Sequence, residues 1–308
     1  MPRKDRIDAA GGAWLLVFSL LFGFNQVVIA VANEGLQPVF FAALRSAGAI
    51  LCVGAWMWLR GLRIGLDRRT APWGVVMGLV FSAEFTLLFW ALDLTTVVRT
   101  SVIFYTMPVW LALAAHFLIP GERMTRSKAA GLALAFGGVV VALLDRAAGE
   151  PAQGSLLGDL CALGAAWMWA GIALCARATP LRDVRPETQL LCQLVVSAPV
   201  LLGLAFAFGP FLREPSLLTW AGLAFQIVAV ASFGFILWLW LLTIYPAAHV
   251  AAFGFLTPIV GVGLGWALLD EHAGPSLLLA LALVAGGLWL VNRPPPGPAA
   301  AAPIGDGG

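Results

Sequence analysis

The sequence predicts an all-α, polytopic membrane protein whose ten transmembrane helices form a five-plus-five inverted repeat. Three observations lead to this fold class: the composition, the spacing of apolar segments, and a similarity between the two halves of the chain. The 308 residues are 61% hydrophobic and only 11% charged, far outside the usual composition of a soluble globular domain. The chain is therefore expected to fold in a lipid bilayer.

Five apolar segments fill the first half of the chain. A helix needs about 20 apolar residues to cross a hydrocarbon core of about 30 Å, because each backbone amide must be hydrogen-bonded within its own segment. Polar turns such as "ANEGLQP", "LRIGLDRRTAP" and "PGERMTRSK" divide the sequence into segments of that length. The spans expected here are about 12–32, 39–59, 72–92, 97–118 and 127–144.

Five more segments follow in the second half, at about 155–176, 188–208, 217–241, 248–268 and 275–291. The turns between them, such as "ATPLRDVRPE", are too short to fold as a separate soluble catalytic domain. Residues 294–308 consist mainly of Pro, Gly and Ala without an apolar period. Such a composition is typical of a disordered tail.

The two halves resemble each other at an offset near 150 residues. In each half, eighteen positions separate a Trp from a Pro, an apolar stretch and a Glu follow, and fifteen positions later comes a Gly pair. The matched residues are Trp90 and Trp240, Pro108 and Pro258, Glu122 and Glu271, and Gly137-Gly138 and Gly286-Gly287. We therefore expect residues 1–150 to form one five-helix repeat and residues 151–293 the other.

An odd number of spans in each repeat makes the second copy enter the membrane from the opposite side. Inverted repeats are a characteristic construction of secondary transporters, because two related halves can exchange conformations around one central site. The sequence thus favours a carrier that works by alternating access.

The ends of the two halves carry a family resemblance. "MPVWLALAAHFLIPGERMTRSKAAGLALAFGG" and "TPIVGVGLGWALLDEHAGPSLLLALALVAGG", within ten spans, resemble the drug/metabolite transporter superfamily, EamA type. In detail the chain looks most like its aromatic and neutral amino-acid exporters, the YddG-type proteins. The resemblance implies a cavity framed by the first four helices of each half, with the fifth helix of each half outside it.

The distribution of Lys and Arg predicts the orientation. With the N-terminus in the cytoplasm, fourteen of the 18 basic residues fall on the inner side and three on the outer side, while Arg45 lies inside the second span. Both termini are therefore expected in the cytoplasm, in a plasma membrane of the bacterial inner-membrane type. The net charge of +2 follows from this topology and gives no reason to expect nucleic acid as a partner.

Glu84 is a carboxylate set into the middle of the apolar stretch "GLVFSAEFTLLFWAL". It lies near the bilayer midplane, and it shares a helix face with Phe81 and Phe85, which stand with it at positions i, i+3 and i+4 counted from Phe81. A charge there costs about 2.5–3.5 kcal/mol on insertion scales. Three roles remain open: Glu84 binds the amine of a substrate, carries a proton during transport, or only pairs with Arg45.

Other deep polar and aromatic residues complete the candidate site. Asn25 in the first span, Tyr105 in the fourth and Trp169 in the sixth are expected to face Glu84 across the cavity, although ordinary helix packing would also explain each of them. Pro108 and Pro258 occupy equivalent repeat positions and are interpreted as matched hinges, with static kinks as the alternative.

These residues favour a secondary-active exporter of aromatic and neutral amino acids and related small metabolites. The alternative is a proton-coupled exporter of lipophilic cationic drugs, and a membrane-embedded enzyme or scaffold is more distant. No catalytic or nucleotide-binding motif is present, and the four cysteines lie within spans, so neither cofactor nor metal is expected. The expected partners are a small-molecule substrate and the lipid bilayer, and the chain is expected to be a monomer or a homodimer.

Overall fold

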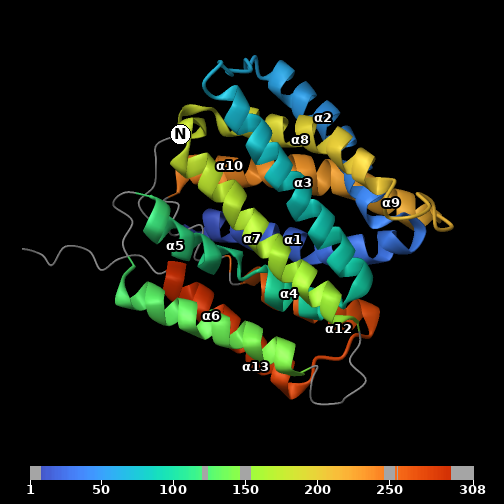
Figure 1. Cartoon of the computed structure of the whole chain (residues 1–308), viewed down its shortest axis with the longest axis vertical. Helices are drawn as coiled ribbons and strands as arrows, with labels where there is room; N and C mark the ends of the chain where they lie inside the picture. The colour runs from blue at the N-terminus through green and yellow to red at the C-terminus, as the bar shows by residue number, and fades with distance from the viewer. Residues whose placement is uncertain (1–7, 120–123, 146–153, 246–253, 255, 293–308) are drawn as a thin grey trace, which may run out of the picture.

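The computed structural model describes residues 8–119, 124–145, 154–245, 254 and 256–292 (Figure 1).

Local sequence signals mark the helix starts in the first half. The first helix follows Asp8, whose carboxylate accepts a hydrogen bond from the Gly11 amide, and the second follows Gln37 with a proline at its first position. The helices are α1 (Ala9–Gly35), α2 (Pro38–Leu59), α3 (Ala71–Leu94), α4 (Val97–Phe104), α5 (Met107–Leu118) and α6 (Arg126–Asp145).

The second half repeats this arrangement. Its elements are α7 (Leu156–Ala178), η2 (Pro180–Asp183), α8 (Pro186–Ala205), α9 (Leu217–Phe225), η3 (Gln226–Gly234), α10 (Phe235–Ile244), α12 (Leu256–Leu269) and α13 (Pro275–Asn292). Within the described residues, eight helical stretches are long and apolar enough to cross a membrane, and α12 and α13 are shorter apolar helices. The predicted all-helical membrane fold is confirmed, and the described helices account for all ten predicted spans.

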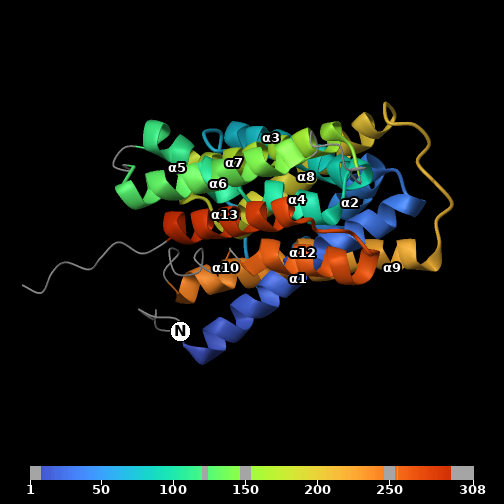
Figure 2. The ribbon, with the colours of Figure 1, turned by 90° about the horizontal axis from the view of Figure 1, so that it is seen from below.

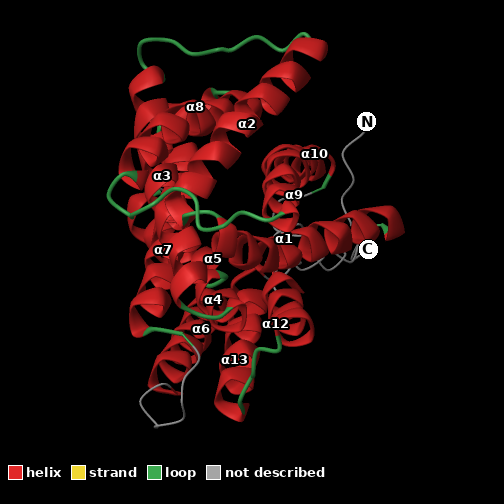
Figure 3. Ribbon diagram, turned by 90° about the vertical axis from the view of Figure 1, so that its right-hand side faces the viewer, coloured by secondary structure: helices red, strands yellow, loops and turns green. Residues whose placement is uncertain are grey.

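The main packing contacts join one half of the chain to the other. α2 packs on α8, α3 packs on α7, and α1 packs on α12. Figure 2 shows α1 running beside α12, and in Figure 3 the group α2, α3 and α8 lies opposite the pair α6 and α13. Because the halves interlock in this way, the interior belongs to both of them.

The fifth helices of the two halves, α6 and α13, form a pair of their own (Figure 1). A Cβ added at Gly131 would lie 2.6 Å from the carbonyl oxygen of Gly287, and one added at Gly138 would lie 2.8 Å from that of Ala280. Small residues allow membrane helices to approach this closely. One glycine of each repeated Gly pair, Gly138 and Gly287, therefore serves this contact.

Two spans depart from the continuous helices that the sequence predicts. The span at 97–118 is broken at Tyr105 and Thr106, where the Thr106 hydroxyl donates to the carbonyl of Ile103 (2.6 Å) just before Pro108. The span at 217–241 contains the π-helical segment η3, in which the Ser232 hydroxyl donates to the carbonyl of Ile227 (2.7 Å). π-Helical turns are frequent at functional sites, and η3 packs against α1 and α2.

Candidate functional site

The Glu84 face of α3 lies in the largest core cluster. Glu84 is only 2% exposed, and Phe81 and Phe85, whose ring centroids are 4.5 Å apart, are buried beside it. Tyr105 is a buried member of the same cluster, and the partly buried Trp169 packs against it. The structure therefore places Phe81 and Phe85 beside Glu84, and Tyr105 and Trp169 in or against the same cluster.

Arg45, from α2, enters this cluster directly. It is 1% exposed, and its guanidinium carbon lies 4.1 Å from the centroid of the Phe85 ring, a cation–π arrangement. Arg45 and Glu84 lie close enough for each charge to act on the other, yet within the described residues no ion pair joins them directly. One of the three roles predicted for Glu84 is simple pairing with Arg45. No direct contact among the described residues supports that role.

The guanidinium of Arg45 is also incompletely bonded. Its Nε and Nη1 atoms donate to no acceptor in the part of the chain that the structure describes. An unpaired buried charge costs several kcal/mol, so this arginine is an unusual feature of the core. The sequence places Arg45 inside a span but does not indicate this environment, because the environment depends on how α2 packs on α3.

Asn25 takes part in a network of side-chain amides between α1 and its neighbours. Its Oδ1 accepts a hydrogen bond from Nε2 of Gln226 in η3, and Oε1 of the adjacent Gln26 accepts one from the Ser101 hydroxyl of α4 (3.0 Å). The Tyr105 hydroxyl donates to the carbonyl of Phe22 (2.9 Å). In this structure Asn25 and Tyr105 thus bond to neighbouring helices. Gln26 is a deep polar residue of the first span by sequence, whereas the sequence gives no indication of Ser101 as its partner.

The deep tryptophans have different surroundings. Trp110 donates its indole N–H to the Thr106 hydroxyl (3.0 Å), and Trp167 is 48% exposed on the outside of the bundle, with its ring against Trp110. Trp110 and Trp169 both pack against the core cluster that contains Phe81 and Phe85.

The two predicted hinge prolines lie near helix starts. Pro108 is the second residue of α5, directly after the break in its span, and Pro258 is buried at the third position of α12. At the start of a helix a proline leaves no internal hydrogen bond unmade. The residues just before α12 lie largely outside the described ranges, and the hinge role of both prolines stays a prediction.

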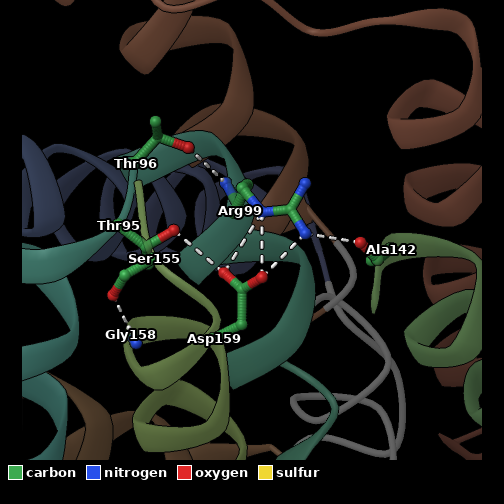
Figure 4. Close-up of polar contacts among 7 residues, drawn as sticks. All are labelled: Thr95, Thr96, Arg99, Ala142, Ser155, Gly158 and Asp159. Atoms are coloured by element: carbon green, nitrogen blue, oxygen red, sulfur yellow. Dashed lines mark hydrogen bonds and ion pairs between the residues drawn. The ribbon is translucent and has the colours of Figure 1, made fainter. Parts of the chain in front are cut away.

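A buried ion pair fastens the helices near the end of the bundle where α3 ends (Figure 4). Asp159 of α7, 0% exposed, accepts hydrogen bonds from the Nε and Nη2 atoms of Arg99 in α4 and from the Thr95 hydroxyl. The Nη2 atom of Arg99 also donates to the carbonyl of Ala142 in α6. Charge-assisted bonds of this kind are strong, and here they link α4 and α6 of the first half to α7 of the second.

Glu271 provides a second link between the halves. Its carboxylate accepts hydrogen bonds from the backbone amides of Val97 (2.8 Å) and Val98 (2.7 Å), the first residues of α4. A carboxylate at a helix N-terminus satisfies free amides and complements the helix dipole. Burial raises the pKa of Glu271, while the Val98 and Val97 amides act in the opposite direction. The repeat-equivalent Glu122 lies outside the described residues.

A third polar link lies at the same end of the bundle. Arg213, in the segment between α8 and α9, pairs with Asp93 at the end of α3, and it also donates to the carbonyl of Asn33. A pocket of about 280 Å³ opens beside it, lined by residues that include Glu34, Arg213 and Glu214. This pocket lies away from the Glu84 face.

The described residues include no group of three or more His, Cys, Asp or Glu side chains placed to hold a metal ion. The four cysteines are free thiols.

Comparison with known proteins agrees with this architecture. The EamA-like transporter family matches residues 9–144 and again residues 156–293. A probable amino-acid metabolite efflux pump of Escherichia coli (strain K12) is 27% identical, with 94% of this chain and 95% of that protein covered. An uncharacterized transporter of Bacillus subtilis (strain 168), YoaV, is 22% identical over 90% of this chain and 94% of its own length.

A crystal structure of another protein has the same fold. It superposes with a TM-score of 0.64 at 20% identity, covering 92% of this chain and 97% of that one. This likeness concerns the fold alone, whereas the two family matches cover most of the chain. The chain therefore belongs to the EamA-like transporter family and is a membrane transporter, not an enzyme.

Proposed function

We propose that this transporter exports aromatic and neutral amino acids, and related small metabolites, by alternating access. The observation that carries the proposal is the Glu84 face: one carboxylate and two phenylalanine rings, closed off in a core shared by both halves. The carboxylate attracts an ammonium group, and the rings pack an apolar or aromatic side chain. The names of the E. coli and Salmonella typhimurium relatives, probable amino-acid metabolite efflux pumps, support this substrate class.

A carboxylate among aromatic rings also suits a lipophilic cation exchanged for a proton. A lipophilic cation would use Glu84 and the rings, but it carries no carboxylate. An amino acid carries a carboxylate as well as the ammonium group. The two substrate classes therefore differ in one chemical feature, which makes them separable by experiment.

Counterflow in proteoliposomes tests the proposal. Vesicles preloaded with unlabelled phenylalanine, methionine or threonine should accumulate the labelled amino acid transiently, because an alternating-access carrier exchanges it for the unlabelled pool, whose outward gradient drives the exchange. Vesicles loaded with a lipophilic cationic dye should show no such overshoot. Overshoot with the dye and none with any amino acid would instead favour the cation exporter.

The closed Glu84 face fits a carrier that exposes its site to one side of the membrane at a time. In this proposal residues 1–150 and 151–293 act as the two repeats, and Pro108 and Pro258 allow their spans to bend during the exchange. The protein works as a monomer or a homodimer.

The distribution of basic residues supports an orientation for the proposed exporter in a bacterial-type inner membrane. In this orientation both termini lie in the cytoplasm. A reporter fused after Arg293 should be active in the cytoplasm, and one inserted at Gly149-Glu150 should report the outside. A C-terminal reporter that is active only outside would contradict the ten-span orientation.

A further inference from the structure

Arg45 is the one buried cation beside Glu84 among the described residues, and its bonding in the protein is incomplete. Nε and Nη1 donate to no acceptor in the described part of the chain, although the whole side chain is 1% exposed. Leaving buried charged donors unpaired is costly, so these two donors require an explanation. A planar guanidinium is suited to a carboxylate, which it can bind through two parallel hydrogen bonds.

The depth of Arg45 matches that of the Glu84 face. Arg45 lies seven residues from the start of α2 at Pro38, and Glu84 lies ten residues before the end of α3 at Leu94. With a rise of 1.5 Å per residue, these positions are about 10 Å and about 15 Å from the same end of the bundle. The guanidinium rests on the Phe85 ring, one residue after Glu84. The cation of Arg45 and the anion of Glu84 thus lie at depths that differ by about 5 Å. The aromatic ring of Phe85 borders both.

We propose that Arg45 binds the carboxylate of the transported amino acid while Glu84 binds its ammonium group. This assignment rests on the proposed function and adds to it a substrate class defined by two charges, a zwitterion with an apolar or aromatic side chain. Phe85 lies under the guanidinium, and Phe81 packs on Phe85. The unpaired Nε and Nη1 donors then have the acceptors that the described protein does not supply.

Binding of three compounds that share a phenyl group tests the proposal. Phenylalanine carries both charges, 2-phenylethylamine only the ammonium, and 3-phenylpropionate only the carboxylate. Dissociation constants are measured on purified protein, wild type and Arg45→Gln. The substitution should weaken phenylalanine and 3-phenylpropionate by at least about tenfold and leave 2-phenylethylamine within about twofold. Glu84→Gln should do the reverse, weakening the two amines and sparing 3-phenylpropionate.

Ser46→Ala is the matched control, because Ser46 is buried next to Arg45 on α2 and bonds to the Ser197 hydroxyl (3.1 Å). It should leave all three affinities unchanged. If Arg45→Gln does not fold, the wild type still decides the question with phenylalanine methyl ester. Masking the carboxylate should weaken binding by at least about tenfold, and an ester that binds as tightly as phenylalanine overturns the assignment.

The outcomes separate this assignment from the proposed function. If Arg45→Gln weakens 2-phenylethylamine as much as phenylalanine, Arg45 has only a structural role and the assignment fails, while amino-acid transport stands. If the wild type binds 3-phenylpropionate through Arg45 but not phenylalanine, Arg45 is a carboxylate-binding group, but the pairing of two charges on one amino acid fails together with the proposed function. Binding of 2-phenylethylamine alone overturns both.

Discussion

Replacing Asp159 with alanine should destabilise the folded protein by about 3 kcal/mol, because it leaves the guanidinium of Arg99 buried without its main partner. Asp159 is fully buried and accepts three side-chain hydrogen bonds from Arg99 and one from Thr95. A loss of this size corresponds to a fall in the apparent Tm on the order of 5–10 °C. Thermal unfolding of the purified protein in detergent measures it.

Asp93→Ala is the control for this prediction. Asp93 also pairs with an arginine between the two halves, but the side chains of Arg213 and Asp93 are 36% and 17% exposed. Ion pairs in contact with solvent contribute only about 0–1 kcal/mol, so this substitution should lower the Tm by a few degrees at most. Equal Tm values for the two variants would show that the Arg99–Asp159 pair does not fasten the bundle.

The helices can be predicted from the sequence because the lipid bilayer restricts which segments can cross it. Every span needs a long apolar segment and a polar turn at each end, so the expected 39–59 and the observed Pro38–Leu59 differ by one residue. The break at Tyr105 and Thr106 does not change the hydropathy of its segment. At the break, the Thr106 hydroxyl donates a hydrogen bond to the carbonyl of Ile103, three residues earlier. A hydropathy pattern does not indicate such a bond.

The candidate site is only partly readable for a similar reason. Glu84, Phe81 and Phe85 share one helix face, so helical spacing alone groups them. Arg45, Gln26 and Glu271 reach their partners across helices that are distant in the chain, and their roles depend on packing. For Glu271 a signal did exist: it stands at the repeat position of Glu122, which marks it as more than a turn residue. The repeat gives no indication that its partners are the amides of Val97 and Val98.

Glu84→Gln should reduce transport of phenylalanine, methionine or threonine by at least about tenfold, equivalent to about 1.4 kcal/mol. Gln keeps the shape of the side chain in the buried cluster but removes the charge that attracts the ammonium group. The folded protein should still be recovered, because no ion pair within the described residues depends directly on Glu84. Glu187→Gln, in the first turn of α8, is a control that removes a carboxylate elsewhere and should leave transport unchanged.

The initial rate of labelled phenylalanine counterflow, compared between wild type and Glu84→Gln in proteoliposomes of equal protein content, tests the substrate site most directly. If the Glu84 face binds the substrate, wild type and Glu187→Gln should show the same overshoot and Glu84→Gln should show at most about one tenth of the rate. A Glu84→Gln protein that exchanges phenylalanine at the wild-type rate, with only its thermal stability altered, would place the substrate elsewhere and leave Glu84 a structural residue.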